Sequence, residues 1–204
     1  MSLKFYTNPM SRGQIARWAL HEAGADYDQV LLDYGTTMKG DDYLKVNPMG
    51  KVPAIDHDGN VVTEGAAICA YLAEAFPDAG LAPSAEERAD YYRWLFFAAG
   101  PLEAAITNRS LGFEVAPDKE MMAGYGNYDR VVDVLDAKFR DDSHVCGSRF
   151  TMADVYVGAQ VVWGTQFGTL PERESLVAYG KRVTDRDAYR AAKAIDDGLI
   201  AENS

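Results

Sequence analysis

The residues best able to carry chemistry lie in the N-terminal third, and Val52 and Pro53 are the most informative pair. They follow a turn-forming Asn-Pro-Met-Gly at 47–50 and precede a short apolar run. Proline has no N–H and belongs at the start or edge of a strand, and the bond before it can be cis at a cost of about 0.5–1 kcal/mol. A cis bond would turn the N–H and C=O of Val52 outward, where another peptide backbone can pair with them. The sequence therefore favours a peptide-like ligand.

Ser11 is the candidate for stabilising a thiolate. It lies at the predicted start of the first helix, where free N–H groups and the helix dipole favour an anion by about 0.3–1 kcal/mol, and Arg12 and Arg17 add positive charge nearby. Lowering a thiol pKa by about two units from about 8.5 takes roughly 2.7 kcal/mol. One hydrogen bond to a charged group supplies about 1.5–3 kcal/mol, so one hydroxyl is of the right size. The alternative is that Ser11 only caps the helix.

Glu64 is the candidate for binding an ammonium group, because it begins the helix that follows a predicted hairpin. A carboxylate at the first helical position also favours the helix dipole, so a purely structural role is the alternative. Lys39 and Lys51 could each hold a carboxylate or simply lie in solvent. Tyr6 offers a second hydroxyl near the site, although its place in a strand favours core packing.

Other chemistries lack their signatures. The histidines at 21, 57 and 144 are isolated, so we expect no metal site, and the glycines at 124 and 126 do not form a dinucleotide-binding loop. With 20 basic and 31 acidic residues, the net charge of −11 disfavours nucleic acid and anionic membranes as partners. No signal peptide or apolar run of membrane-spanning length is visible, and two isolated cysteines suggest a reducing, cytoplasmic setting.

The elements around the candidate residues are predicted to be strand, helix, strand, hairpin and helix. Strands are predicted over 3–7 and 27–32, joined by a helix from Ser11 to a stop at Gly24, and this order implies parallel pairing. A short helix is predicted over 42–46. A hairpin over 53–63 turns at Asp58-Gly59, and a helix follows over 64–76. We therefore expect a mixed four-stranded sheet covered by helices.

The remainder of the chain is predicted to be helical. A breaker-rich linker at about 78–83 separates a domain of residues 1–77 from a domain of residues 84–204. Helices are predicted over 85–109, with a kink at Pro101, and over 119–141, 155–167, 172–184 and 187–201. Phe150, Thr151 and Asp154 form a capping arrangement ahead of the apolar helix. The expected fold class is α/β followed by an all-α bundle.

Together these motifs resemble the soluble glutathione transferases, in a bacterial-like form with a serine-type active site, over essentially the whole chain. The resemblance implies a thioredoxin-like N-terminal domain without a Cys-x-x-Cys pair. It implies that Ser11 stabilises the glutathione thiolate, that Val52 contacts the glutathione backbone and that Glu64 binds the γ-glutamyl amine. The full set of implied glutathione-binding residues is Lys39, Lys51, Val52, Pro53, Glu64 and Gly65.

Gly65 is a departure from the family pattern. The family usually has serine or threonine here, and its hydroxyl helps to hold the γ-glutamyl carboxylate. The N–H of Gly65 can still bind that carboxylate at the helix N-terminus. One side-chain hydrogen bond is lost, about 0.5–1.5 kcal/mol or up to roughly tenfold in affinity.

The resemblance implies an enzyme in which the glutathione thiolate, without a metal, attacks a small electrophile. The electrophile pocket is expected at Met10, Arg12, Arg109 and Phe113, and a cytoplasmic homodimer with a role in detoxification is expected. Two alternatives stay open. One is a glutathione-binding or assembly module with little catalysis, which Gly65 favours. The other is a glutathione-dependent reductase, which the lack of a cysteine at the first helix start disfavours.

Overall fold

The computed structural model describes residues 2–202, which form two compact units. One unit comprises the chain up to Ala82 together with the stretch from Asp185 onward, and the other comprises Pro83–Thr184. The predicted domain limits, 1–77 and 84–204, follow the order of the chain and stay a prediction. Within the described residues no helix is both long enough and apolar enough to cross a membrane.

The first unit contains a four-stranded mixed sheet, as predicted. Its strands are β1 (Leu3–Thr7), β2 (Asp28–Leu31), β3 (Ala54–His57) and β4 (Asn60–Thr63), in the order β2-β1-β3-β4. β1 pairs with β2 in parallel and with β3 antiparallel, and β3 pairs with β4 antiparallel. The predicted turn at Asp58-Gly59 is confirmed: both residues have positive φ, 50° and 86°, as a tight hairpin requires.

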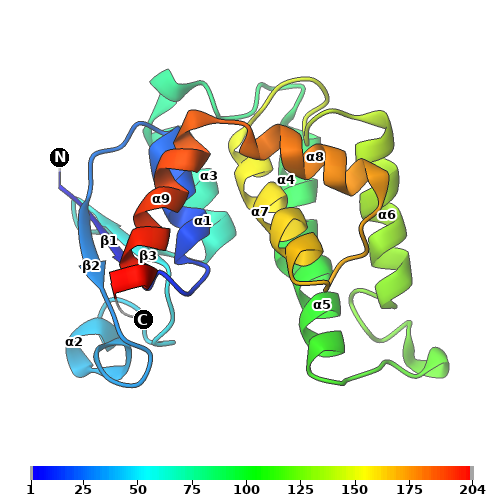
Figure 1. Ribbon diagram of the computed structural model, residues 1–204, viewed down its shortest axis with the longest axis horizontal. Helices are drawn as coiled ribbons and strands as arrows, with labels where there is room; N and C mark the ends of the chain where they lie inside the picture. Colours follow the sequence, from blue (N-terminus) through cyan, green and yellow to red (C-terminus); the bar gives the residue numbers. More distant parts are fainter. Residues whose placement is uncertain (1, 203–204) are drawn as a thin grey trace. The chain divides into compact units, whose positions relative to one another are not determined.

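Helices α1 (Gly13–Glu22) and α3 (Gly65–Ala75) contact the sheet, and α9 (Asp187–Glu202) lies beside α1 (Figure 1). Gly24, with φ +64°, ends the first helix as predicted. The link from β2 to β3 carries the short helices η1 (Thr37–Lys39) and α2 (Asp41–Leu44). η2 (Pro77–Ala79) follows α3.

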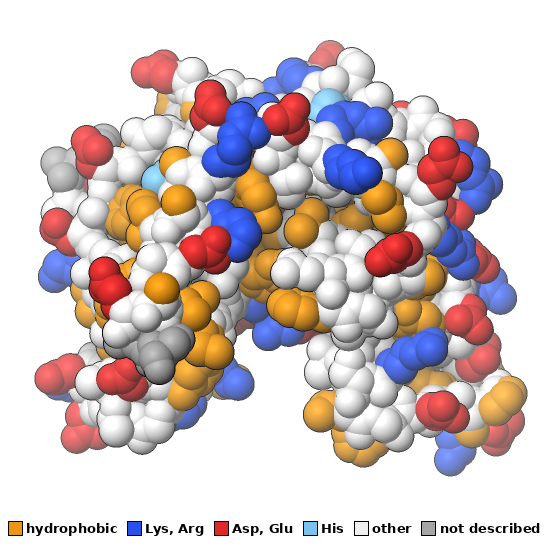
Figure 2. Space-filling model, in the orientation of Figure 1, with side chains coloured by type: hydrophobic (Ala, Val, Ile, Leu, Met, Phe, Trp, Pro, Cys, Tyr) orange, Lys and Arg blue, Asp and Glu red, His pale blue; other side chains and the backbone are white. Residues whose placement is uncertain are grey.

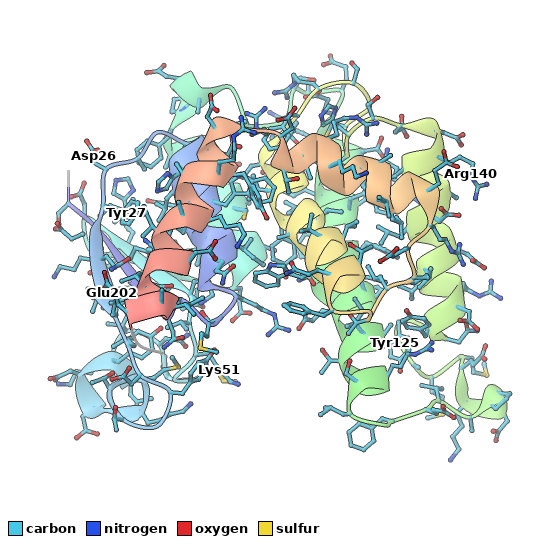
Figure 3. The ribbon with its side chains drawn as sticks, viewed as in Figure 1. Asp26, Tyr27, Lys51, Tyr125, Arg140 and Glu202 are labelled. Carbon is cyan, nitrogen blue, oxygen red and sulfur yellow. The ribbon has the colours of Figure 1, made fainter. Side chains whose placement is uncertain are left out.

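Packing of α9 on α1 explains why α1 is buried along nearly its whole length. Arg17, in the middle of α1, is 1% exposed, and its Nε lies 2.9 Å from Oδ2 of Asp196 on α9. The Arg17 guanidinium also lies over the Phe5 ring and donates a hydrogen bond to the Tyr27 hydroxyl, 3.0 Å away (Tyr27 is labelled in Figure 3). The prediction that Arg17 adds positive charge near Ser11 is therefore wrong, because Asp196 neutralises that charge in the interior.

The second unit is helical, as predicted. It contains α4 (Arg88–Phe97), α5 (Glu103–Ser110), η4 (Pro117–Lys119), α6 (Tyr128–Asp141), α7 (Met152–Gln166) and α8 (Glu174–Thr184). A π-helical segment, η3 (Ala98–Leu102), joins α4 to α5 and contains Pro101, where the kink was predicted. α6 begins nine residues later than the predicted 119, because Gly126 has φ +69° and Asn127 caps the helix by accepting from the N–H of Arg130.

The predicted capping arrangement at the start of α7 is confirmed for Thr151 and Asp154. The N–H of Thr151 donates to Oδ2 of Asp154 at 2.9 Å, and the reciprocal bond is also present. Asp154 additionally accepts from the N–H of Val145 and from the Tyr179 hydroxyl. This buried carboxylate therefore ties the loop before α7 and helix α8 to the start of α7.

Replacing Asp196 by asparagine tests the buried ion pair. We expect Asp196→Asn to lower the free energy of unfolding by about 3 kcal/mol, because it leaves the Arg17 charge buried without a counter-charge. Asp197→Asn is the matched control: its partner Lys193 is 2.7 Å away, but both side chains are about half exposed, so we expect a change below about 1 kcal/mol. Chemical denaturation measures both variants, and equal effects would contradict the assignment.

Candidate functional site

The register of the sheet brings three candidate segments to one end of the first unit. Tyr6 near the end of β1 lies opposite Ala54, the first residue of β3, and Ala54 lies opposite Thr63, the last residue of β4. Adjacent strands are about 4.8 Å apart. The turn that carries Ser11 follows β1, the segment with Val52 and Pro53 precedes β3, and the stretch from Glu64 follows β4. All three therefore lie next to the same ends of neighbouring strands.

The turn between β1 and α1 is held by hydrogen bonds from side chains to several of its backbone groups. The carbonyls of residues 8, 9 and 10 accept from Ser11 Oγ at 2.6 Å, Gln14 Nε2 at 2.7 Å and the Tyr34 hydroxyl at 3.0 Å, respectively. The Asn8 amide accepts from the N–H of Met10 and donates to the carbonyl of Leu32 beyond β2. Bonds within the turn, to α1 and to the segment that follows β2 thus hold the position of Ser11.

Ser11 precedes α1, which begins at Gly13, and its hydroxyl is engaged on both sides. It donates to the Asn8 carbonyl at 2.6 Å and accepts from the N–H of Gly13 at 2.9 Å. The residue at the N-cap position is Arg12, which makes no side-chain cap bond. Ser11 therefore satisfies one N–H group of the helix start, and it can donate to a ligand only after releasing the Asn8 carbonyl.

Thr7 is a residue that the sequence reasoning did not single out. Its side chain is fully buried at the end of β1, and its Oγ1 has no hydrogen-bond partner among the described residues. A Cβ atom added at Gly13 would lie 2.0 Å from Thr7 Oγ1 and 2.9 Å from Ser11 Oγ. Both hydroxyl oxygens therefore face the same point of the backbone, and only glycine fits there. A buried hydroxyl without a partner costs about 1–3 kcal/mol.

The segment before β3 has the predicted backbone. The Val52-Pro53 bond is cis, and neither the N–H nor the C=O of Val52 forms a hydrogen bond within residues 2–202. The carbonyl of Lys51 accepts from the Tyr43 hydroxyl at 2.5 Å and from Asn47 Nδ2 at 2.8 Å. These two bonds hold the segment while they leave the polar groups of Val52 open.

The two candidate lysines differ in their surroundings. Lys39 donates from Nζ to the carbonyl of Gly50 at 2.6 Å, and Gly50 has φ +56° in the turn. The side chain of Lys39 therefore already supports the turn before Val52. Lys51 is exposed, and Figure 3 places it at the lower end of the first unit. Of the two ammonium groups, that of Lys51 is the more available to an incoming carboxylate.

Glu64 has an unusual backbone for a residue with a side chain. Its φ and ψ are 65° and 119°, and it occupies the N-cap of α3, so the predicted position inside the helix is wrong by one residue. The Glu64 side chain is exposed and makes no cap bond. The N–H groups of Gly65, Ala66 and Ala67 have no partner among the described residues. A carboxylate and free helix N–H groups thus lie side by side, suited to an ammonium and an anion respectively.

Tyr6 lies on the other face of the sheet from Thr7, because successive side chains of a strand alternate. Its ring is 5.5 Å from that of Tyr43 and packs in a cluster with Leu32, Met38 and Ala54. This placement agrees with the expectation of core packing. Of the two hydroxyl groups predicted near the site, Ser11 and Tyr6, that of Ser11 is the one bonded to the start of α1.

Two of the predicted electrophile residues belong to the first unit and two to the second. Met10 is 72% exposed beside Arg12, which is also exposed. In the second unit, Phe113 is 64% exposed, and the Arg109 guanidinium stacks 4.1 Å from the centre of the Tyr128 ring. Four hydrophobic side chains of the segment that follows α5 are exposed, those of Leu111, Phe113, Met121 and Met122. Figure 2 shows hydrophobic side chains at the surface in this part of the second unit. Within the described residues no three His, Cys, Asp or Glu side chains form a metal-binding group.

The comparisons with known proteins agree with this geometry. Residues 1–74 match the glutathione S-transferase N-terminal domain. The chain is 29% identical to the glutathione S-transferase GstA of Escherichia coli O157:H7 over 98% of both chains. It is 31% identical to the solved beta class glutathione S-transferase of Sphingomonas chungbukensis, with a TM-score of 0.76 over 95% of this chain and 98% of that chain. A sphingomonad glutathione S-transferase solved in complex with glutathione is 29% identical, again with a TM-score of 0.76 and the same coverage.

The chain belongs to the glutathione S-transferase family. The expected fold class, a thioredoxin-like domain with a mixed four-stranded sheet followed by a helical part, is confirmed. The individual roles of the candidate residues stay predictions.

Replacing Glu64 tests whether its backbone is strained. We expect Glu64→Gly to raise the free energy of unfolding by about 1 kcal/mol, because glycine adopts positive φ without the cost that a side chain imposes. Glu64→Gln keeps the side chain and should leave stability unchanged. Equilibrium denaturation compares the three proteins, and a Glu64→Gly variant less stable than Glu64→Gln would show that the conformation carries no strain.

Proposed function

We propose that this protein is a glutathione transferase whose first unit binds glutathione along Val52 and activates its thiol at Ser11. The single observation that carries the proposal is that an unpaired peptide unit, a carboxylate beside free helix N–H groups and a serine at a helix start lie next to the same ends of neighbouring strands. Each matches one part of a tripeptide thiol. Relatives with bound glutathione support the assignment.

The central peptide of glutathione pairs with Val52. A peptide backbone needs one donor and one acceptor, and both groups of Val52 are open within the described residues. Pro53 begins the turn into β3 and cannot itself donate. The Tyr43 and Asn47 bonds to the Lys51 carbonyl hold this segment before the ligand arrives, so little ordering is needed on binding.

The charged ends of glutathione bind groups of opposite charge, or the N–H groups of a helix start, in the first unit. The γ-glutamyl carboxylate binds at the N–H groups that open α3, beginning with Gly65, and the γ-glutamyl ammonium binds Glu64. The glycine carboxylate binds Lys51, while Lys39 keeps the turn around Gly50 in place. Because Gly65 has no hydroxyl, we expect glutathione affinity to lie below that of a relative with serine at this position, by up to roughly tenfold.

Ser11 lowers the pKa of the bound thiol by donating to the sulfur. The Ser11 O–H turns from the Asn8 carbonyl toward the sulfur and keeps its proton, while the N–H of Gly13 continues to donate to the same oxygen. The thiol proton is released to solvent. The thiolate then forms a bond to an electrophilic carbon, and the leaving group departs with the electron pair of the broken bond.

Met10 and Arg12 in the first unit, and Arg109 and Phe113 in the second, are proposed as electrophile-binding residues, as the family resemblance implies. Exposure of Met10 and Phe113 supports this assignment, since both offer apolar contact area that nothing in their own unit covers. We further propose a cytoplasmic homodimer with a role in detoxification, as the family resemblance implies. A size measurement in solution tests the dimer directly.

A thiol reductase is disfavoured by the state of the cysteines. Cys69 is fully buried in α3, and burial raises the pKa of its thiol well above the usual range. Burial is also the largest effect on Cys146, and the pKa of that thiol is raised to about 11. Neither thiol is therefore suited to nucleophilic exchange at neutral pH.

Ser11→Ala tests the proposed activation. We expect the pKa of the bound glutathione thiol to rise by about one unit or more, because one charge-assisted hydrogen bond is lost, while the dissociation constant changes little. The ultraviolet absorbance of the thiolate, titrated in the binary complex, measures the shift. Ser110→Ala, which removes an exposed hydroxyl that donates to the Ile106 carbonyl, is the control. An unchanged titration for Ser11→Ala would reduce Ser11 to a helix cap.

A second experiment tests Glu64. We expect Glu64→Gln to weaken glutathione binding by about tenfold, since a charge-assisted bond to the γ-glutamyl ammonium is replaced by a neutral one. N-acetylglutathione lacks that ammonium, so its weaker binding should be insensitive to the substitution. Calorimetric titration of both ligands against both proteins gives the coupling. Equal loss for the two ligands would mean that Glu64 does not bind the amine.

A further inference from the structure

Thr7 presents a buried hydroxyl that the proposed reaction does not yet use. Its Oγ1 is without a hydrogen-bond partner in the described chain, and its side chain has no exposed surface. Its backbone role is separate, because the Thr7 carbonyl accepts from the N–H of Leu32 at 2.9 Å. The hydroxyl therefore adds nothing to the sheet, and valine would fill the same volume.

The Thr7 and Ser11 hydroxyl groups both lie against Gly13. The position that a Gly13 side chain would take is 2.0 Å from Thr7 Oγ1 and 2.9 Å from Ser11 Oγ. The absence of a side chain at Gly13 lets both hydroxyl oxygens lie against the same point of its backbone. When the Ser11 O–H turns away from the Asn8 carbonyl, the Thr7 hydroxyl is therefore a nearby group without a partner among the described residues.

We propose that Thr7 is a positioning residue that donates a hydrogen bond to Ser11 Oγ when Ser11 turns its proton from the Asn8 carbonyl to the sulfur of bound glutathione. This inference rests on the proposed function. A serine hydroxyl has one proton and two lone pairs. One lone pair already accepts from the N–H of Gly13, and the other is open among the described contacts.

The donated bond has a physical consequence. A hydroxyl that accepts a hydrogen bond becomes a better donor, because consecutive hydrogen bonds polarise one another. Thr7 would therefore strengthen the bond from Ser11 to the thiolate without touching the ligand. The bond to Ser11 would also give the Thr7 hydroxyl a partner in the ligand-bound state only. It would therefore stabilise the glutathione complex relative to the free protein.

The test is a double-mutant cycle on the thiol titration of the binary complex. We expect Thr7→Val to raise the pKa of bound glutathione by about half a unit, a roughly threefold lower thiolate fraction below the pKa. Ser11→Ala should give the larger shift described above, and the double variant should match Ser11→Ala alone, since Thr7 acts through Ser11. Thr7→Ser keeps a hydroxyl and should titrate as the unmodified protein does.

Stability provides the second readout. Thr7→Val should unfold at the same temperature as the unmodified protein or higher, because it removes a buried hydroxyl that has no partner in the free state. Thr184→Val, which removes a hydroxyl bonded to the Gly180 carbonyl in α8, controls for a general effect of this substitution and should leave the thiol titration unchanged.

The outcomes separate this inference from the proposed function. If Ser11→Ala shifts the titration and Thr7→Val does not, Thr7 has no positioning role and the proposed function stands. If the two shifts add in the double variant, or if Thr7→Ser shifts as Thr7→Val does, Thr7 acts through packing and the inference is overturned. If Ser11→Ala itself causes no shift, the assigned role of Ser11 fails and this inference fails with it.

Discussion

The site depends on one row of the sheet, in which Tyr6, Ala54 and Thr63 lie opposite one another on β1, β3 and β4. A shift of one residue in either pairing would move every side chain of the strand to the other face. It would also move Val52 or Glu64 away from the turn that carries Ser11. Leu3, Phe5 and Ile55 are buried on one face of the sheet and Ala54 on the other, and the observed register keeps both sets covered. Core packing therefore determines which polar groups meet at the edge.

Sequence reasoning succeeded where a local signal determines the backbone. The turn at Asp58-Gly59, the end of the first helix at Gly24 and the capping pair at Thr151 and Asp154 each depend on residues within a few positions of one another. Val52 and Pro53 belong to the same class, since proline limits its own position and that of its neighbour. Local chemistry of this kind needs no knowledge of tertiary contacts.

The failures concern contacts between residues that are distant in sequence. Arg17 reads as a surface charge, and only its partner Asp196, on a helix at the far end of the chain, explains why it is buried. Thr7 reads as an ordinary strand residue until Gly13 and Ser11 are placed beside it. The strained backbone of Glu64 has no sequence signature either, because glycine normally marks a positive φ. Each of these features becomes visible only when the fold brings separate segments together.

The engagement of Ser11 in the free protein bears on how selectively it favours a thiolate over a thiol. Its hydrogen bond to the Asn8 carbonyl is neutral and contributes about 0.5–1.5 kcal/mol, whereas a bond to a charged sulfur contributes about 1.5–3 kcal/mol. Replacing the bond to the Asn8 carbonyl by a bond to the sulfur is therefore favourable when the ligand thiol is ionised. It has little driving force when the thiol is neutral. The difference, on the order of 1–1.5 kcal/mol, corresponds to about one pKa unit. A serine that begins with a weak partner thus discriminates by charge, and because the N–H of Gly13 holds its oxygen in place, the exchange requires only a rotation of the O–H bond.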